Sequence, residues 1–107
     1  MNRSNWKGFE RKIAAFFGTR RTPLSGMNSG HNTSSDSLHD TLYIECKKRK
    51  SMAVVKLYDD TLKKARKEEK VPVVVVTETG RRGQPLIVCA MDDLQAIAHQ
   101  RWKVRHD

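Results

Sequence analysis

The clearest hydrophobic pattern in this chain is an alternation of apolar and polar residues over positions 42–47, which predicts a β-strand. Side chains alternate across a strand, so its two faces carry different chemistry. The apolar face holds Leu42, Ile44 and Cys46, and the opposite face holds Tyr43, Glu45 and Lys47. The strand therefore presents an acid and a base next to each other on one face.

Helical spacing of apolar residues predicts three amphipathic helices, over 4–18, over 51–70 and from 92 onward. Gly18 is expected to end the first of them. Their apolar positions are Trp6, Phe9, Ile13, Phe16 and Phe17, then Val54, Tyr58, Leu62 and Ala65, then Leu94, Ile97, Ala98 and Trp102.

Further strands are expected around the helices. The continuous valine run at 73–76 is typical of a central strand covered on both faces. A returning strand is predicted at 85–90 and a short strand at 19–24. Together with a hairpin near residue 40, the order is one helix, three short strands, a helix, two strands and a helix. This order predicts a single α/β domain over 1–107, with a mixed central sheet flanked by helices.

The hairpin is predicted between 36–38 and 41–48. In its expected register, Asp36 shares a face with Glu45 and lies diagonally from it, about 7–8 Å away backbone to backbone. Two carboxylates at that separation can close on one ion. Asp40 is the alternative acid, but its place at the turn is roughly 16 Å along the strand from Glu45. Asp36 is therefore preferred.

The net charge of the chain indicates a class of binding partner. The 107 residues include 21 Lys and Arg against 12 Asp and Glu, which leaves a formal charge of +9. Such a balance favours a polyanion, with nucleic acid first, although a basic surface without a polyanionic partner is the alternative. No apolar run is long enough for a membrane span, so a cytoplasmic location is expected. Cys46 and Cys89 are predicted to be reduced core residues.

The candidate chemistry is cleavage of a phosphodiester with a divalent metal. Mg²⁺ prefers oxygen ligands and needs few from the protein. Asp36 and Glu45 supply carboxylates, the Cys46 carbonyl offers a neutral oxygen, and Glu10 on the first helix is predicted to bind the metal directly or through water. Lys47 is expected to position or help deprotonate the attacking water. The predicted catalytic residues are thus Glu10, Asp36, Glu45 and Lys47.

These residues resemble a known family. Glu45-Cys46-Lys47, preceded by Asp36 and by a helical Glu10, is similar to the motif of the PD-(D/E)XK nuclease superfamily, and most similar to small Holliday-junction-resolvase-like nucleases of archaea and phages. Segments 9–12, 20–26 and 70–73 belong to the same ordered set, and the resemblance covers about residues 5–95. Two departures are a Ser at position 35 in place of Pro, and no Gln in the first turns of the second helix, where Lys56 or Lys63 would substitute.

The resemblance implies a restriction-endonuclease-like α-β-β-β-α-β core and an Mg²⁺- or Mn²⁺-dependent endodeoxyribonuclease. It further implies a homodimer that resolves four-way junctions in DNA recombination, near the nucleoid or in the host cytoplasm of a phage, without a small-molecule substrate. The expected DNA contacts are Arg20, Arg21, Lys48, Arg49, Arg81 and Arg82, with Ser25 and Ser29 in a flexible polar loop at about 25–35. Two alternatives remain, a repair or restriction-type duplex nuclease and a non-catalytic nucleic-acid-binding module.

Overall fold

The valine run lies in strand β2 (Val71–Glu78), and all four of its valines are buried. β2 stands between β1 (Leu42–Arg49) and β3 (Leu86–Val88) in the three-stranded sheet of the described chain, so its predicted central position is confirmed. The protein is known from a computed structural model, which describes residues 3–23, 32–49 and 53–106.

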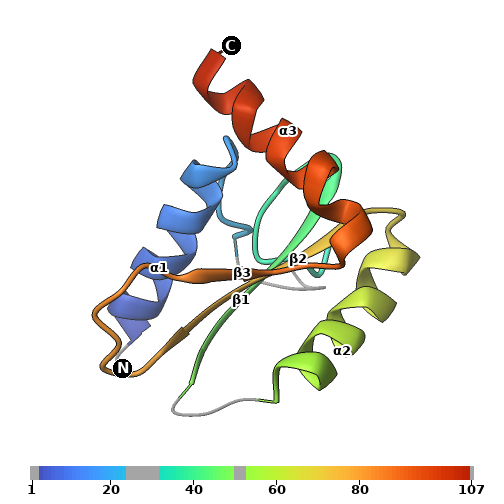
Figure 1. Cartoon of the computed structure of the whole chain (residues 1–107). Helices are drawn as coiled ribbons and strands as arrows, with labels where there is room; N and C mark the ends of the chain where they lie inside the picture. The colour runs from blue at the N-terminus through green and yellow to red at the C-terminus, as the bar shows by residue number, and fades with distance from the viewer. Residues whose placement is uncertain (1–2, 24–31, 50–52, 107) are drawn as a thin grey trace.

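The sheet is mixed, as expected. β1 pairs with β2 in parallel, with Ile44 opposite Val73 and Cys46 opposite Val75. β3 pairs with β2 in the antiparallel sense. A parallel neighbour requires a crossover, which helix α2 (Val54–Lys67) supplies between β1 and β2 (Figure 1).

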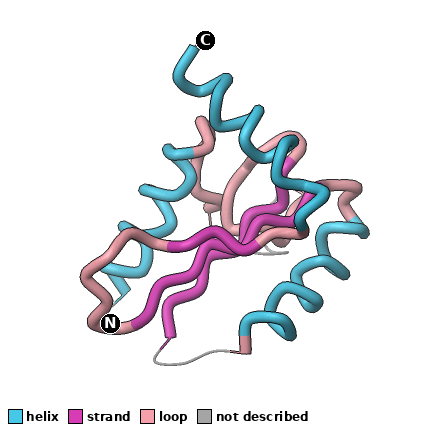
Figure 2. Tube along the Cα trace, viewed as in Figure 1, coloured by secondary structure: helices cyan, strands magenta, loops and turns pink. Residues whose placement is uncertain are grey.

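Helices cover both faces of the sheet (Figure 2). Helices α1 (Arg3–Phe16) and α3 (Leu94–His106), the latter entered through a short 3₁₀ turn at Met91–Asp93, lie on one face. The core on that face is formed by Ile13, Phe17, Leu42, Ile44, Cys46, Val73, Val75 and Ile97. Residues that alternate with these strand positions point to the other face, where α2 buries Thr61 and Ala65.

Gly18 ends the first helical segment, as predicted. Its φ of +72° is left-handed, and the N–H of Thr19 returns to the carbonyl of Ala14 at 2.9 Å. A Cβ at Gly18 would also stand 2.7 Å from Cγ2 of Val104 on α3. Glycine is therefore needed twice at this position, for its backbone angle and for the close approach of α3.

The helix stripes are less completely buried than their spacing predicted. Phe16 is 40% exposed and lies under the guanidinium of Arg101, 4.1 Å from its ring centre. On α3, Ile97 is buried, whereas Leu94 and Trp102 are 61% and 53% exposed. α2 is shorter than the helix expected over 51–70, and residues 51 and 52 lie outside the described residues.

Two of the three strands expected before α2 were predicted wrongly, whereas the third is present as β1. Residues 19–23 and 36–38 form no regular strands and share one antiparallel bridge, between Arg21 and Ser37, while residue 24 lies outside the described residues. The regular hairpin with 41–48 is absent from the described chain. The N–H of Leu38 donates to the carbonyl of Arg20, and the N–H of Asp36 donates to Ile44. The observed order of regular elements is α-β-α-β-β-α.

The chain is compact, with a Cα radius of gyration of 13.2 Å. A value of about 13 Å is usual for a domain of roughly 100 residues. None of the described helices has the length and apolar character that crossing a bilayer requires.

Two glycine substitutions test this account of α1. Gly18→Ala should lower the free energy of unfolding by about 1–2 kcal/mol, because the new Cβ meets both a left-handed φ and Val104. Gly8→Ala should raise it by about 0.5–1 kcal/mol, because Gly8 is inside α1 and its Cβ would meet nothing within 4 Å. Denaturant unfolding of both variants measures the difference, and equal stabilities would contradict the account.

Candidate active site

The outer edge of β1 is closed by side chains instead of by another strand. The hydroxyl of Ser35 accepts the N–H of Ile44 at 2.9 Å and donates to the carbonyl of the same residue at 3.0 Å. The N–H of Asp36 also donates to this carbonyl, at 2.9 Å. Asp36 Oδ2 in turn accepts the N–H of Cys46 at 2.8 Å. Asp36 is thereby held against the strand that carries Glu45.

Three carboxylates lie near enough to this edge for the charges of Glu45 and Glu10 to act on Asp36. Glu10 is 2% exposed and Glu45 is 8% exposed, so neither charge is well hydrated. Burial, followed by the charges of Glu45 and Glu10, raises the pKa of Asp36 to about 8, although its bond from the Cys46 N–H opposes the shift. Asp36 therefore holds a proton at neutral pH unless a cation replaces it.

Two of the acids have a cationic partner within the chain. Arg21 donates from Nε to Glu10 Oε1 at 2.6 Å, and this pair is largely shielded from solvent. Lys47 Nζ lies 3.5 Å from Glu45 Oε2, consistent with the expected placement of the two side chains on one strand face. The Lys47 side chain keeps 28% exposure, so its ammonium can still meet a partner from solvent.

Asp36 is the acid near Glu45, but not through the predicted register. In the expected hairpin Asp36 would have faced Tyr43, whereas its N–H bonds to Ile44 and its side chain reaches Cys46. Asp40 is exposed at the start of the turn into β1. The preference for Asp36 over Asp40 is therefore consistent with the structure, while the strand pairing used to reach it was wrong.

The donor set of Asp36 and Glu45 suits Mg²⁺ or Mn²⁺ in chemical kind, because these ions prefer carboxylate oxygens and retain water ligands. A divalent cation would also relieve the repulsion that raises the pKa of Asp36. Within the described ranges, no group of three or more His, Cys, Asp and Glu side chains is arranged to hold a metal ion. A metal bound here would therefore depend on water and backbone oxygens as well.

Cys46 contributes through its backbone. Its side chain is fully buried in the core, and burial, together with the charge of Asp36, raises the pKa of the thiol. The protonated thiol is a poor metal ligand. The Cys46 carbonyl oxygen is therefore the atom expected to contact a metal, and this contact remains a prediction.

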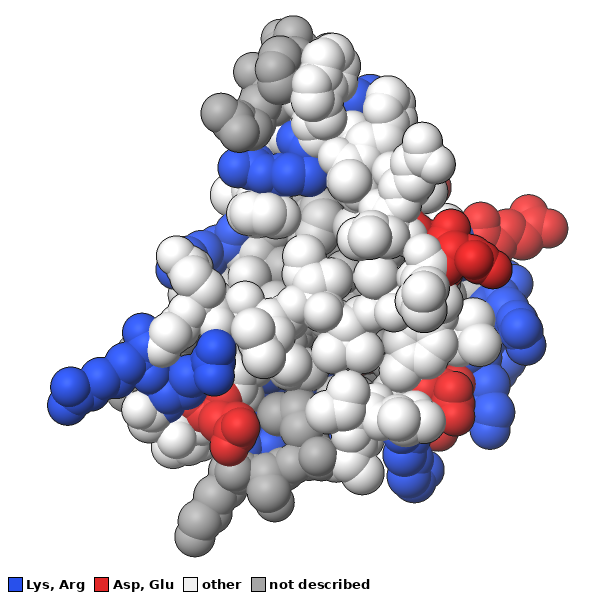
Figure 3. Space-filling view, in the orientation of Figure 1, with Lys and Arg blue, Asp and Glu red and all other residues white. Residues whose placement is uncertain are grey.

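The basic residues named from the sequence fall into two places. Arg20 and Arg21 lie next to 36–38 through the bridge to Ser37. Lys48 and Arg49 are opposite Thr77 and Glu78, at the end of β2 from which the loop with Arg81 and Arg82 follows. Ser25 and Ser29 lie outside the described residues. In Figure 3, Lys and Arg stand around the rim of one face, whose centre is uncharged.

Several residues near the candidate site were not predicted from the sequence. Arg11 was not among the predicted DNA contacts, yet it lines a hollow together with Arg20 and Arg21. Thr33 and Ser35 were assigned to a flexible loop, but they are 5% and 0% exposed. Glu68, 34 residues beyond Ser34, accepts hydrogen bonds from that segment. Local patterns could not reveal these contacts, because each joins segments far apart in the chain.

Comparisons of the sequence with protein-family models and with curated proteins, and of the fold with solved structures, found no match. The function is therefore inferred from the residues and geometry of this chain.

The acid cluster makes a prediction about stability and pH. The pKa of Asp36 is 3.8 when unperturbed and about 8 in the folded protein, so folding favours the protonated form. Its contribution to stability is present below pH 3.8 and is lost as pH rises toward 8. In metal-free buffer, Asp36→Asn should therefore raise the unfolding free energy at pH 8.5 by roughly 1–3 kcal/mol, and by much less at pH 4.

Asparagine suits this test because its amide can accept from the Cys46 N–H. Asp40→Asn removes an exposed carboxylate nearby and is the matched control, for which little change is expected at either pH. Thermal or denaturant unfolding across this pH range gives the measurement. A stabilisation that does not grow with pH would show that Asp36 is not under charge repulsion.

Proposed function

We propose that this chain is a metal-dependent DNA endonuclease of the PD-(D/E)XK type, selective for branched DNA and similar to Holliday junction resolvases. The observation that carries the proposal is that Asp36, bound to the Cys46 N–H at the edge of β1, lies within reach of the charges of Glu45 and Glu10, with Lys47 3.5 Å from Glu45. These residues come from separate segments of a chain with a formal charge of +9. Crowded acids in a basic protein suit a cation that bridges to a phosphate.

Asp36 and Glu45 would hold the metal, Mg²⁺ or Mn²⁺, together with the Cys46 carbonyl, and Glu10 would act directly or through water. When bound, such an ion neutralises phosphate charge and lowers the pKa of a coordinated water. The protein's own part is to fix Asp36 by the Cys46 N–H and to hold Glu10 by Arg21. Lys47 would orient the attacking water and offset charge that develops on the phosphate.

The finer fold assignment is part of the proposal. The α-β-β-β-α-β core of the superfamily has two strands that the described part of this chain lacks as regular elements. Segments 20–22 and 36–38 would take their places, a correspondence supported by the Arg21–Ser37 bridge and by the hydrogen bonds on either side of it. Both segments would then be shortened versions of the family's strands, packed along the outer edge of β1.

DNA would be held through its phosphates. Arg20 and Arg21 would contact it on one side of the site, and the cations at the ends of β1 and β2 on the other. Paired cuts in a four-way junction require two sites, so the active form would be a homodimer. The exposed apolar residues of α3, including Leu94, are the surface suited to such contact. Such an enzyme would act in the cytoplasm, near the nucleoid, or in the host cell of a phage.

One alternative function has a specific observation in its favour. Glu10 and Glu45 each have a cationic partner, and the described residues lack a ready three-ligand metal group. These features are also those of a non-catalytic nucleic-acid-binding module whose acids stabilise the fold. Such a module would bind DNA through the same basic residues and would require no metal.

Cleavage of synthetic DNA separates these functions. Wild type should cut a four-way junction in Mg²⁺ and should be inactive in EDTA. Glu45→Gln should lower the rate by at least about a hundredfold while DNA binding persists, because the loss is to the chemical step. Glu78→Gln removes an exposed acid at the end of β2 and should cut like wild type.

Other results of the cleavage assay would favour other functions. Equal cutting of four-way and linear DNA would remove the junction selectivity and leave a general nuclease. Sequence preference on linear duplex would favour a repair or restriction-type enzyme. Binding without any Mg²⁺-dependent cutting would favour the non-catalytic module.

The phosphate contacts predict a steep dependence of binding on salt. Replacing Arg49 and Arg82 together by Ala should reduce the slope of log K against log salt concentration by about 2, since each phosphate contact contributes about 0.9. Lys64 and Lys67, exposed on α2, are the matched control for the same loss of charge. A double Ala variant at these two lysines should keep the wild-type slope. Equal effects of both pairs would show that binding is not localised at the strand ends.

A further inference from the structure

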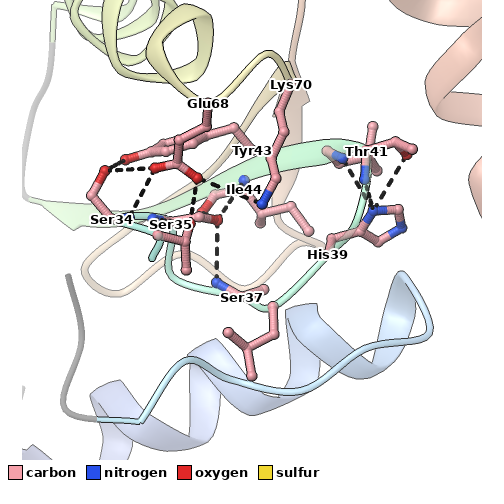
Figure 4. A network of polar contacts seen from close by, with 12 residues as sticks. Ser34, Ser35, Ser37, His39, Thr41, Tyr43, Ile44, Glu68 and Lys70 are labelled. Carbon is pink, nitrogen blue, oxygen red and sulfur yellow. Dashed lines mark hydrogen bonds and ion pairs between the residues drawn. The ribbon is translucent and has the colours of Figure 1, made fainter. Parts of the chain in front are cut away.

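Glu68 lies far from the carboxylate cluster in sequence, but it receives three hydrogen bonds from the segment that precedes Asp36. Thr33 Oγ1 donates to Glu68 Oε1 at 2.5 Å. The N–H and the hydroxyl of Ser34 both donate to Oε2, at 2.9 and 3.1 Å. Figure 4 shows this carboxylate, at the end of α2, turned toward Ser34. The residue at the C-terminal end of α2 thus binds residues 33 and 34, which lie far from it in the sequence.

The carboxylate is held in its charged form by its surroundings. Burial alone would raise the pKa of Glu68, but the hydrogen bonds from Ser34 and Thr33 and the charge of Lys70 outweigh it and lower the pKa. Lys70 Nζ lies 3.5 Å from Oε1. Because Ser34 gives its proton to Glu68, the Tyr43 hydroxyl, 2.6 Å away, donates to Ser34. Tyr43 keeps that proton, since burial raises its pKa to about 12.

A continuous set of hydrogen bonds connects Glu68 to Asp36. The Thr33 hydroxyl that donates to Glu68 accepts the N–H of Ser35 at 3.1 Å. Ser35, with no exposed surface, is bound to both backbone groups of Ile44. The next residue is Asp36, whose N–H and carboxylate complete the contact with β1. Within this set, Glu68 is the charged group that fixes Thr33 and Ser34.

We infer that Glu68 is a positioning residue for the proposed metal site, which it serves by holding residues 33–35 so that the Asp36 carboxylate stays against β1 next to Glu45. This inference rests on the proposed function in one respect, that Asp36 is a metal ligand. Positioning by residues that do not touch the ion usually changes metal affinity about 10- to 100-fold. Glu68 itself touches neither metal nor DNA in this role.

Paired charge-neutral variants test the inference. Glu68→Gln and Glu69→Gln remove the same charge from adjacent residues, but Glu69 is exposed. Glu68→Gln should raise the Mg²⁺ concentration for half-maximal cleavage by about tenfold, and Glu68→Ala by more, whereas kcat at saturating Mg²⁺ should stay within about twofold. Glu69→Gln should match wild type in both. Thr33→Val, which removes two hydrogen bonds without a charge, should act in the same direction as Glu68→Gln.

Amide hydrogen exchange supplies a readout that does not require activity. The N–H groups of Ile44 and Cys46 are bonded to Ser35 and Asp36, so both should exchange about tenfold faster in Glu68→Gln. Val75, in the central strand, should keep its wild-type exchange rate. Restoration by Glu68→Asp of part of the protection at Ile44 would support a need for the carboxylate.

The outcomes distinguish the two proposals. Wild-type protein that shows no Mg²⁺-dependent cleavage would refute the proposed nuclease, and the exchange rates would still decide whether Glu68 positions Asp36. Active wild type with Glu68 variants unchanged in Mg²⁺ midpoint would overturn the positioning role alone. Faster exchange at Ile44, Cys46 and Val75 alike would also overturn it, because Glu68 would then only stabilise the fold.

Discussion

The unpaired edge of β1 is the constraint on which the rest of this structure depends. An edge strand leaves a row of N–H and carbonyl groups without partners, and such groups must be satisfied when they are buried. Here the backbone of Ile44 is satisfied by Ser35 and by the Asp36 N–H, and the Cys46 N–H is satisfied by the Asp36 carboxylate. The contacts that cover the edge are therefore the same contacts that bring Asp36 to Glu45. At the edge of β1, the same hydrogen bonds thus stabilise the fold and form the candidate site.

This arrangement disfavours a negative charge on Asp36. Asp36 is placed by good hydrogen bonds, yet burial and two neighbouring acids disfavour its charge. Arg21 compensates Glu10 and Lys47 compensates Glu45, which leaves Asp36 as the member without a cation of its own among the described contacts. A neutral Asn at this position could also accept the Cys46 N–H, and it would avoid the repulsion, so the need to cover the strand edge does not by itself explain a third acid here. That asymmetry is the physical argument for a function that introduces a cation.

The sequence predicted those parts of the fold and site that depend on local periodicity. The valine run, the alternation along β1, the helix that carries Glu10 and the stop at Gly18 are all local, and each lies where its pattern indicated. Two strands and the hairpin were wrong, and residues 33–35 were taken for a loop. Small polar residues have no apolar periodicity, so their burial depends on partners elsewhere. For Thr33 that partner is Glu68, 35 residues away.

The failed hairpin also explains how the site is assembled. His39 Nδ1 accepts the N–H groups of Thr41 and Leu42, both at 3.1 Å, and burial lowers the pKa of the ring, which favours the neutral acceptor. This contact occupies the Thr41 N–H, which a tight two-residue turn would have directed at Leu38. Ser37 is thereby left to bridge with Arg21, and Arg21 reaches Glu10. The wider turn lets residues 36–38 join β1 to the segment that carries Arg21.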